Sequence, residues 1–281
     1  MTTAFDWTGP IGDVWAEEWR RTDRSLAGLA DPLDAAILAA ATDAGTGVGP
    51  IVDIGCGAGT TSLAIAAALS ERQVRGIDIS PALIGIATER GQGLPNLSFV
   101  AGAAEEQVAA AAPVDLLISR HGVMFFPDPV AAFVALRRAT APGGRLVFSC
   151  FRAMALNSFA TEPVIAAEGA LPAVPSGYAP GPFAFADPVL VRDLLTEAGW
   201  SGIECTPVDF AYRVGEGSDP VADALGFLQR IGPAARALRA APPGERTAMV
   251  ERVTAMLEQR RSGDTVDFPA AAWLCSAHNM A

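Results

Sequence analysis

Val-Asp-Ile-Gly-Cys-Gly-Ala-Gly-Thr, residues 52–60, joins an apolar stretch to a helix-forming run through a turn that contains three glycines. Because glycine has no Cβ, Gly55, Gly57 and Gly59 let the backbone turn sharply and come close to a ligand. A glycine turn between a strand and a helix is typical of a nucleotide-type cofactor site, where backbone N–H groups and a helix N-terminus face the ligand. The stretch predicts an α/β fold built around a cofactor loop.

The spacing of these glycines separates two kinds of ligand. A dinucleotide fingerprint reads G-x-G-x-x-G and directs its N–H groups at a pyrophosphate, whereas this turn reads G-x-G-x-G and follows Asp53. A carboxylate there would repel a pyrophosphate but suits a ligand with an ammonium or sulfonium group. Asp53 as a mere cap on the strand end is the alternative.

Composition excludes several classes of partner. The 281 residues are 51% hydrophobic, with 20 Lys plus Arg against 31 Asp plus Glu, so the formal net charge is −11. Such a balance opposes contact with a nucleic acid backbone. The N-terminal residues include no early basic group and no apolar run, and no stretch reaches the ~18 apolar residues of a membrane span. We expect a cytoplasmic protein without a membrane segment.

A metal centre is not expected. The cysteines form no C-x-x-C pair, and only two histidines accompany them, so no ligand cluster is visible in the sequence. These residues are Cys56, Cys150, Cys205, Cys275, His121 and His278.

Alternating apolar and helical stretches predict the sheet. Strands are expected at 51–54, 74–79, 97–100, 114–119 and 145–151, separated by helices at 60–69, 80–90 and 130–140. Strands that alternate with helices indicate a parallel sheet covered on both faces. Two later strands, at 203–214 and 271–278, would complete a doubly wound, Rossmann-like, seven-stranded and mostly parallel sheet.

We interpret 1–281 as a single domain with insertions. Residues 1–47 would form a helical cap, 48–151 the cofactor-binding core, and 152–186 and 215–265 insertions that make a substrate lid. Within the first insertion, 171–186 is rich in Pro, Gly and aromatic residues and predicts an ordered loop. Further helices are expected at 187–199, 220–231 and 243–260.

The quoted stretch closely resembles motif I of the class I S-adenosylmethionine-dependent methyltransferases. Four more segments, 76–80, 99–106, 114–129 and 142–148, resemble the family's later motifs, so the resemblance covers roughly 48–151. Weaker similarity to a small-molecule branch extends over 180–188 and 271–278. The resemblance implies S-adenosylmethionine as the cofactor and a small-molecule substrate.

The resemblance also implies a set of cofactor contacts. Asp53 would face the methionine ammonium, the loop would line the ligand, and Asp78 would accept the ribose hydroxyls. Asp78 alone does not separate this family from dinucleotide enzymes, which use an acid at the same place. The family often has Asp where this chain has Ala103, so adenine recognition would fall to backbone groups. The implied contacts are Asp53, Gly55, Cys56, Gly57, Asp78, Ile79, Ala103, Ala104, Ser119 and Arg120.

Two further features have competing interpretations. Trp15 and Trp19 lie four residues apart on a predicted helix and would share a face, either for core packing or to attract the sulfonium.

His121 follows the fourth strand, in the loop that faces the methyl donor in the family. An unperturbed imidazole pKa near 6.5 would let it act as a base, with a pH–rate inflection between about pH 6 and 7.5. The alternative is that the ring of His121 serves only for packing.

The leading hypothesis is an enzyme that transfers a methyl group to a small, mostly apolar molecule by SN2 displacement. Proximity and exclusion of water would supply most of the rate, so a base is optional. A non-catalytic S-adenosylmethionine-binding module is one alternative. A nicotinamide-dependent oxidoreductase is another, although Thr60 and Thr61 stand where its third glycine belongs. The sequence leaves the oligomeric state open.

Overall fold

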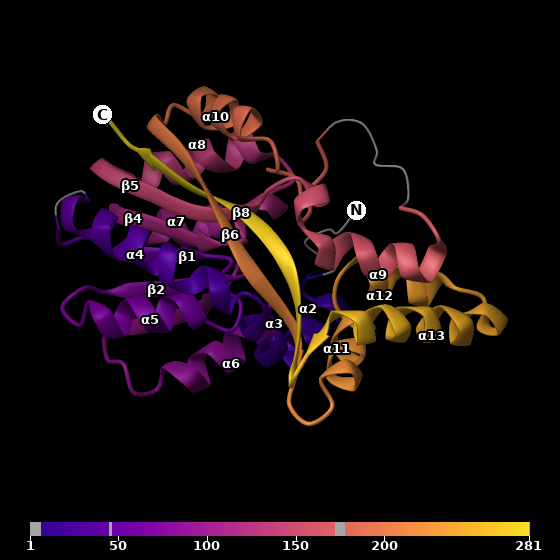
Figure 1. Ribbon diagram of the computed structural model, residues 1–281. Coiled ribbons are helices and arrows are strands. Elements are labelled where there is room, and N and C mark those ends of the chain that lie inside the picture. Colours follow the sequence, from indigo (N-terminus) through magenta and orange to yellow (C-terminus); the bar gives the residue numbers. More distant parts are fainter. Residues whose placement is uncertain (1–6, 45–46, 172–177, 281) are drawn as a thin grey trace.

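The computed structural model describes residues 7–44, 47–171 and 178–280, and its centre is an eight-stranded sheet (Figure 1). Seven strands lie in the order β3-β2-β1-β4-β5-β8-β6, and β7 pairs with β8 off this path. The strands are β1 (Ile51–Ile54), β2 (Val74–Asp78), β3 (Leu97–Ala101), β4 (Val114–Arg120), β5 (Thr140–Phe151), β6 (Ser201–Glu216), β7 (Arg261–Ser262) and β8 (Thr265–His278). The first five are parallel, whereas β8 is antiparallel to its neighbours. The predicted doubly wound, mostly parallel sheet is confirmed.

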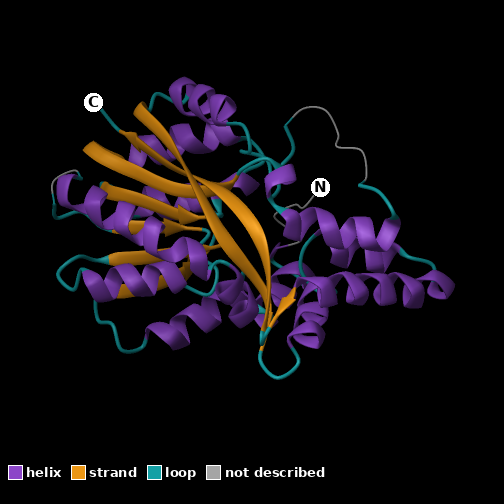
Figure 2. Ribbon diagram, viewed as in Figure 1, coloured by secondary structure: helices purple, strands orange, loops and turns teal. Residues whose placement is uncertain are grey.

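Helices cover both faces of the sheet, as the secondary-structure colours of Figure 2 show. On one face α4 (Ala27–Asp43) and α5 (Thr60–Ala68) bury Leu33, Ile37 and Ile65 against the sheet. On the other face α7 (Ala104–Ala110), α8 (Pro129–Ala139) and α10 (Pro188–Glu197) bury Val108 and Phe133. Because helices cover both faces of the sheet, β1 and β4 are buried on both sides and most of their residues are apolar.

Capping residues set the starts of several helices. Ser80 accepts a hydrogen bond from the Leu83 N–H at the start of α6 (Pro81–Gly91), and Asp128 caps α8 in the same way. Each of these two helices has Pro at its first position, where the missing N–H costs nothing. The predicted helices at 80–90 and 130–140 are confirmed to within a residue or two.

The C-terminal half forms a long two-stranded arm that carries a group of helices. β6 and β8 pair from Ser201↔His278 to Glu216↔Thr265. The helices beyond the arm are α9 (Ser158–Glu168), α11 (Pro220–Leu228), α12 (Pro233–Ala240) and α13 (Pro243–Arg260). They gather at the end of the arm, away from α8 and α10 (Figure 1). β8 is six residues longer at its start than the strand predicted at 271–278, because 265–270 pair with β6.

The N-terminal segment differs from the single helix expected around Trp15 and Trp19. It consists of α2 (Pro10–Glu17), α3 (Trp19–Ser25) and α4, with the break at Glu18 between the two tryptophans. Among the described residues no single helix is long and apolar enough to cross a membrane, and the pair α3–α4, bent by 73°, passes that test by length and composition only.

Part of the predicted loop at 171–186 falls on 172–177, outside the described residues. From 178 onward the segment contains neither helix nor strand, as expected, and it is well anchored. The Tyr178 hydroxyl donates to the Phe126 carbonyl at 2.6 Å, and the Phe185 ring is buried. Two short 3₁₀ turns, Val123–Phe125 and Met154–Leu156, follow β4 and β5.

Candidate functional site

A cavity of about 410 Å³ lies where β1, β2 and β4 end. Its size falls within the roughly 300–1,000 Å³ of small-molecule sites. The sheet order changes direction between β1 and β4, and the carboxyl ends beside such a point form a ligand-binding crevice in open α/β sheets. The lining residues that carry the argument below are Trp7, Trp15, Trp19, Asp23, Leu26, Gly55, Cys56, Gly57, Asp78, Ile79, Ala103, Ala104, Glu105, Arg120, His121, Phe125, Phe126, Phe151 and Tyr212.

The glycine turn forms one wall of this cavity. Gly55, Gly57 and Gly59 have φ values of 65°, 55° and 83°, a region that side chains rarely adopt. A Cβ on Gly55 would lie 2.9 Å from the Gly122 Cα, so the loops after β1 and β4 touch through bare backbone. A Cβ on Gly57 would meet nothing within 4 Å, which leaves that backbone open to a ligand.

Asp78 lies at the end of β2 and borders the cavity as predicted. Its Oδ2 accepts the Gly57 N–H at 2.9 Å, and its Oδ1 accepts the Ser80 N–H at 2.8 Å. Burial raises the pKa of this carboxyl, while the backbone N–H bonds act to lower it. Each oxygen keeps a second lone pair, so the carboxylate can still accept a pair of hydroxyls.

Asp53 lies beneath the loop and does not border the cavity. The Ser62 hydroxyl of α5 donates to its Oδ2 at 2.6 Å, and its Oδ1 is buried with no partner among the described residues. Burial raises the pKa of Asp53 to about 7, although Ser62 and the charge of Arg120 oppose this. Contact with a ligand ammonium therefore stays a prediction, and the orphaned Oδ1 is the atom that could make it.

Ala103 and Ala104 border the cavity beside Asp78, as expected of an adenine-contacting segment. Ala103 occupies the N-cap position of α7 and supplies no side-chain cap, so the first-turn N–H groups of α7 lack that partner. Ile79 and Cys56 also border the cavity, and burial raises the pKa of the Cys56 thiol.

Trp15 and Trp19 both border the cavity, although they belong to different helices. Trp15 packs 5.6 Å from Trp7, centroid to centroid. The Trp19 ring instead faces two guanidinium groups, with Arg90 at 4.1 Å and Arg20 at 4.4 Å from its centroid. Trp19 thus makes its cation–π contacts with the protein's own arginines, which leaves Trp15 as the better candidate for a ligand cation.

Arg120 ends β4, borders the cavity and is held by Asp23 of α3 at 2.7 Å. Asp23 also pairs with Arg90 at 3.1 Å and accepts a bond from the Thr60 hydroxyl at the start of α5. One carboxylate thereby joins the N-terminal helices to the cofactor loop and to β4. Sequence reasoning missed Asp23, since its partners lie far from it along the chain.

Ser119 lies below the cavity rather than at its surface. Its hydroxyl donates to the Ile54 carbonyl at 2.7 Å and accepts the Gly122 N–H at 3.1 Å. Ser119 therefore fastens the β4 loop to β1, and its predicted direct contact with the cofactor stays untested.

His121 borders the cavity with an unusual backbone, at a φ of 60°. Its Nδ1 lies 2.9 Å from the Ser149 hydroxyl, its Nε2 is buried without a partner among the described residues, and its ring packs edge-on 4.1 Å from Phe151. Burial, with the positive charge of Arg120, lowers the pKa of His121 to about 3. The expected inflection between pH 6 and 7.5 therefore does not fit this imidazole, which is neutral and weakly basic at pH 7.

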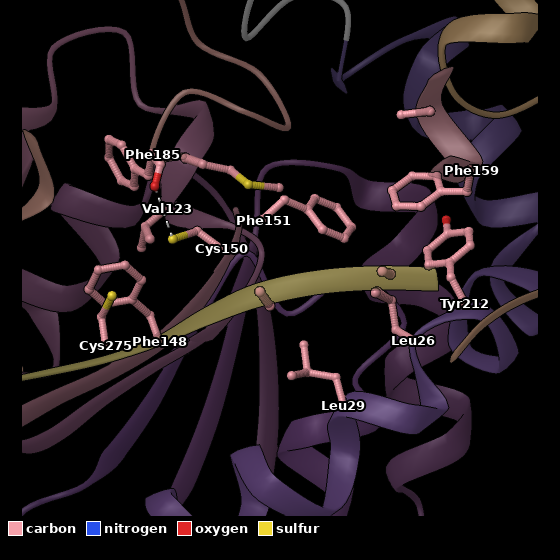
Figure 3. Packing of buried hydrophobic residues seen from close by; sticks show 14 of the residues in the cluster. Leu26, Leu29, Val123, Phe148, Cys150, Phe151, Phe159, Phe185, Tyr212 and Cys275 are labelled. Carbon is pink, nitrogen blue, oxygen red and sulfur yellow. Dashed lines mark hydrogen bonds between the residues drawn. The ribbon is translucent and has the colours of Figure 1, made fainter. Parts of the chain in front are cut away.

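Aromatic side chains from further elements complete the lining. Phe151 of β5 and Tyr212 of β6 line the cavity, and Phe159 of α9 packs beside both rings (Figure 3). The rings of Phe159 and Tyr212 stack at 3.9 Å with an interplanar angle of 13°. Trp7 and Phe125, which also line the cavity, pack edge-on at 5.3 Å. Within the described part of the chain no three His, Cys, Asp or Glu side chains are placed to hold a metal ion.

Comparison with known proteins agrees with this geometry. Residues 52–148 match the family model described as a methyltransferase domain. The malonyl-[acyl-carrier protein] O-methyltransferase of Xylella fastidiosa is 30% identical over 151 residues, which are 52% of this chain and 51% of that protein. The trans-aconitate 2-methyltransferase of Methylobacterium radiotolerans is 35% identical over 95 residues, 34% of this chain and 35% of that one. The chain thus spans about half or less of these curated relatives.

Solved structures share the fold at low sequence identity. A putative methyltransferase from Bacillus halodurans superimposes with a TM-score of 0.53 at 15% identity, over 88% of this chain and 99% of that one. Phosphoethanolamine N-methyltransferase 2 of Haemonchus contortus, in a complex with S-adenosyl-L-methionine, superimposes with a TM-score of 0.53 at 14% identity, over 99% of this chain and 60% of that one. These likenesses concern the fold alone.

Proposed function

Since the chain belongs to the class I S-adenosylmethionine-dependent methyltransferases through its domain at residues 52–148, we propose that it transfers the methyl group of S-adenosylmethionine to a small, mostly apolar molecule. The observation that carries the proposal is the joint placement of Gly57 and Asp78 on one cavity wall, linked by the Gly57 N–H bond to the carboxylate. An open backbone would thus lie beside the proposed ribose acceptor.

The donor is proposed to lie along the carboxyl ends of β1, β2 and β3. The ribose would bond to Asp78, the adenine to backbone groups of Ala103 and Ala104, and the methionine part to the turn at Gly55 and Gly57. The ammonium would approach Asp53, whose buried Oδ1 has no partner among the described residues. Among the described residues Arg120 is the cation that borders the cavity, and its N–H groups that do not bond to Asp23 would favour the donor's carboxylate.

When bound, S-adenosylmethionine supplies an electrophilic methyl group on a sulfonium. The protein's part is to align the acceptor with that carbon and to exclude water, and such positioning can supply roughly 7 to 11 kcal/mol in the best cases. The helices at 1–47 and the insertions at 152–186 and 215–265 are proposed to act as the cap and substrate lid over the site. Trp7, Trp15 and Pro182, which line the cavity, support the assignment for the cap and the first insertion, and Phe159 of α9 packs against the lining ring of Tyr212.

His121 is proposed to shape the acceptor end rather than to take a proton. Its pKa of about 3 and its bond to Ser149 make it a neutral ring at working pH. A neutral imidazole of such low basicity would remove a proton poorly.

Calorimetric titration tests the proposal. We expect S-adenosylmethionine and its demethylated product to bind with similar affinity and NAD not to bind, because the turn reads G-x-G-x-G rather than the G-x-G-x-x-G of a pyrophosphate loop and Asp53 lies buried beneath it. Turnover is then followed by mass spectrometry of S-adenosylhomocysteine over a panel of phenols, amines and acids. Binding of NAD in preference to the methyl donor would refute the assignment, and donor binding without turnover on any acceptor would favour a non-catalytic binding module.

A further inference from the structure

The acceptor end of the cavity is apolar and aromatic. Leaving aside the loop, β2 and α7, most of the lining side chains carry rings or apolar groups, and the polar exceptions are Thr22, Asp23, Arg120, His121 and the Tyr212 hydroxyl. The apolar and aromatic members include Trp7, Trp15, Leu26, Phe126, Phe151 and Tyr212. Offset rings separated by 4.5–7 Å suit the faces and edges of a flat molecule.

The positive charge at the cavity is shared between two arginines that pair with one carboxylate, Asp23. All 20 basic side chains of the chain are arginines, and the undescribed stretches 1–6, 45–46, 172–177 and 281 contain none of them. Of the described residues that line the cavity, Arg120 alone is cationic. It pairs with Asp23 at 2.7 Å, and the two side chains are only 13% and 16% exposed. The other cation on Asp23, Arg90, is also drawn toward the Ala58 carbonyl and the Trp19 ring.

An anionic acceptor would therefore enter without a partner. A buried charge is tolerated when it is paired, and a carboxylate or phosphate among Phe151, Phe126 and Trp7 would have no free cation among the described lining residues. Asp78 and Glu105, which also border the cavity, would add like charge. With the donor's carboxylate proposed to take the remaining N–H groups of Arg120, an anionic acceptor would have to compete with that carboxylate or displace Asp23 from a largely buried pair.

We propose that the acceptor is a flat, apolar molecule of aromatic size that carries no carboxylate or phosphate, and that Asp23 enforces this choice by holding Arg120 in an ion pair. This inference rests on the proposed function and adds a substrate class to it. It separates the chain from the acceptor named for the Methylobacterium relative, trans-aconitate, which is a carboxylate. Asp23 acts here as a specificity-determining residue, through the arginine that it holds.

A matched set of probes tests the proposal on the whole protein saturated with S-adenosylhomocysteine. Naphthalenemethanol, naphthoate and naphthyl phosphate share one ring system and differ in charge. Their binding is measured by calorimetry and by the fluorescence of the cavity tryptophans. We expect the alcohol to bind at least about tenfold more tightly than either anion, the loss that an unpaired buried charge predicts. Tighter or equal binding of an anion overturns the proposal, and so does failure of the alcohol to bind.

Two variants test the part assigned to Asp23. Asp23→Asn leaves Arg120 without its anionic partner, and we expect the preference for the alcohol over naphthoate to fall by roughly fivefold or more. The matched control is Asp209→Asn, which breaks the exposed pair with Arg152 away from the cavity and should leave the preference unchanged. An unchanged preference in Asp23→Asn overturns the role of Asp23. Loss of S-adenosylhomocysteine binding by the unmodified protein would instead count against the proposed function, so the two failures are distinguishable.

Discussion

Gly55 and Gly122, in the loops that follow the paired strands β1 and β4, face each other backbone to backbone. A Cβ on Gly55 would lie 2.9 Å from the Gly122 Cα, and a Cβ on Gly122 would lie 3.0 Å from the Gly55 Cα and 2.5 Å from the Ile54 carbonyl oxygen. The cavity is therefore framed by two loops whose separation is set by the absence of side chains. Ser119 holds the same contact from below through its bonds to Ile54 and Gly122.

Gly122→Ala should force these loops apart. Overpacking of a tight contact costs roughly 1–3 kcal/mol, which corresponds to a fall in Tm of about 2–10 °C in a chain of this size. Cofactor binding should weaken as well, because the Gly55–Gly57 turn moves with the contact. Gly244→Ala, in the exposed first turn of α13 where an added Cβ meets nothing within 4 Å, is the control and should not lower Tm. If Gly122→Ala and Gly244→Ala have the same Tm, the contact between Gly55 and Gly122 has room for a Cβ.

Asp78→Asn should weaken binding of S-adenosylmethionine and of its demethylated product by about tenfold or more. Hydrogen bonds to a charged acceptor contribute roughly 1.5–3 kcal/mol, and both ligands carry the ribose that Asp78 would bind. Calorimetry with the two ligands measures the effect. Asp187→Asn makes the same exchange at the N-cap of α10, away from the cavity, and should leave both affinities intact. A loss confined to one ligand would argue against ribose recognition.

Asp53 and His121 should make opposite contributions to the pH dependence of stability. The pKa of His121 falls to about 3 on folding, so the unfolded chain binds more protons and this contribution to stability is lost as pH decreases from 6.5 toward 3. The pKa of Asp53 rises to about 7, so its contribution is present below 3.8 and is lost as pH increases through 7. Urea unfolding at intervals between pH 4 and 7 measures both.

The variants separate the two contributions. His121→Phe should reduce the gain in unfolding free energy between pH 4 and 6.5, whereas Asp53→Asn should steepen that gain. The slopes are compared rather than the absolute stabilities, since the φ of 60° at His121 adds strain for Phe. If both variants change the slope in the same direction, one of the two assignments is wrong.

The turnover of His121 variants should depend on the size of the side chain at this position rather than on its basicity. His121→Phe keeps the ring volume beside Phe151, and we expect it to retain most of kcat, with no inflection between pH 6 and 7.5 in either protein. His121→Ala leaves a space beside the acceptor and should lose more activity. A rate loss of about 10²-fold in His121→Phe, with donor affinity intact, would restore the base role.

Ala103→Asp should stabilise the fold before any ligand is added. Ala103 is the uncapped N-cap residue of α7, and Asp in place of Ala there contributes about 0.5–2 kcal/mol. We also expect tighter binding of the adenine cofactor but not of its hypoxanthine analogue, since only adenine offers the amino group. Thermal melts with and without ligand measure both effects. Ala110→Asp places the same charge at the last residue of α7, where the helix dipole disfavours it, and should lower Tm.

The sheet and the cofactor loop could be predicted from the sequence because their signals are local. Strand β1 matches its predicted bounds, and β2 and β3 match to within one residue, since burial on both faces produces short apolar runs. The glycine turn was recognisable because its positive φ values require glycine itself. Asp78 followed at a fixed distance, and the structure places it at the cavity.

The remainder of the site depends on contacts between distant segments. Asp23 reaches Arg90 and Arg120, 67 and 97 residues further along the chain, and nothing in its own helix marks it. The break at Glu18 separates Trp15 from Trp19, although both satisfy one helical spacing. The lowered pKa of His121 also depends on such contacts, because the sequence displays an imidazole but not its burial.

The strand order carries a consequence for synthesis on the ribosome. β8 is the last strand of the chain, yet it lies between β5 and β6, and the 16 residues of β6 have no other partner in the sheet. Until residues 265–278 have emerged, β5 presents an open edge and β6 remains unpaired, and such edges recruit other chains. The nascent protein should thus depend on a holding chaperone until its final strand arrives. Ribosome-bound chains arrested before Thr265 should be cleaved by protease within β6, and chains extended past His278 should be protected.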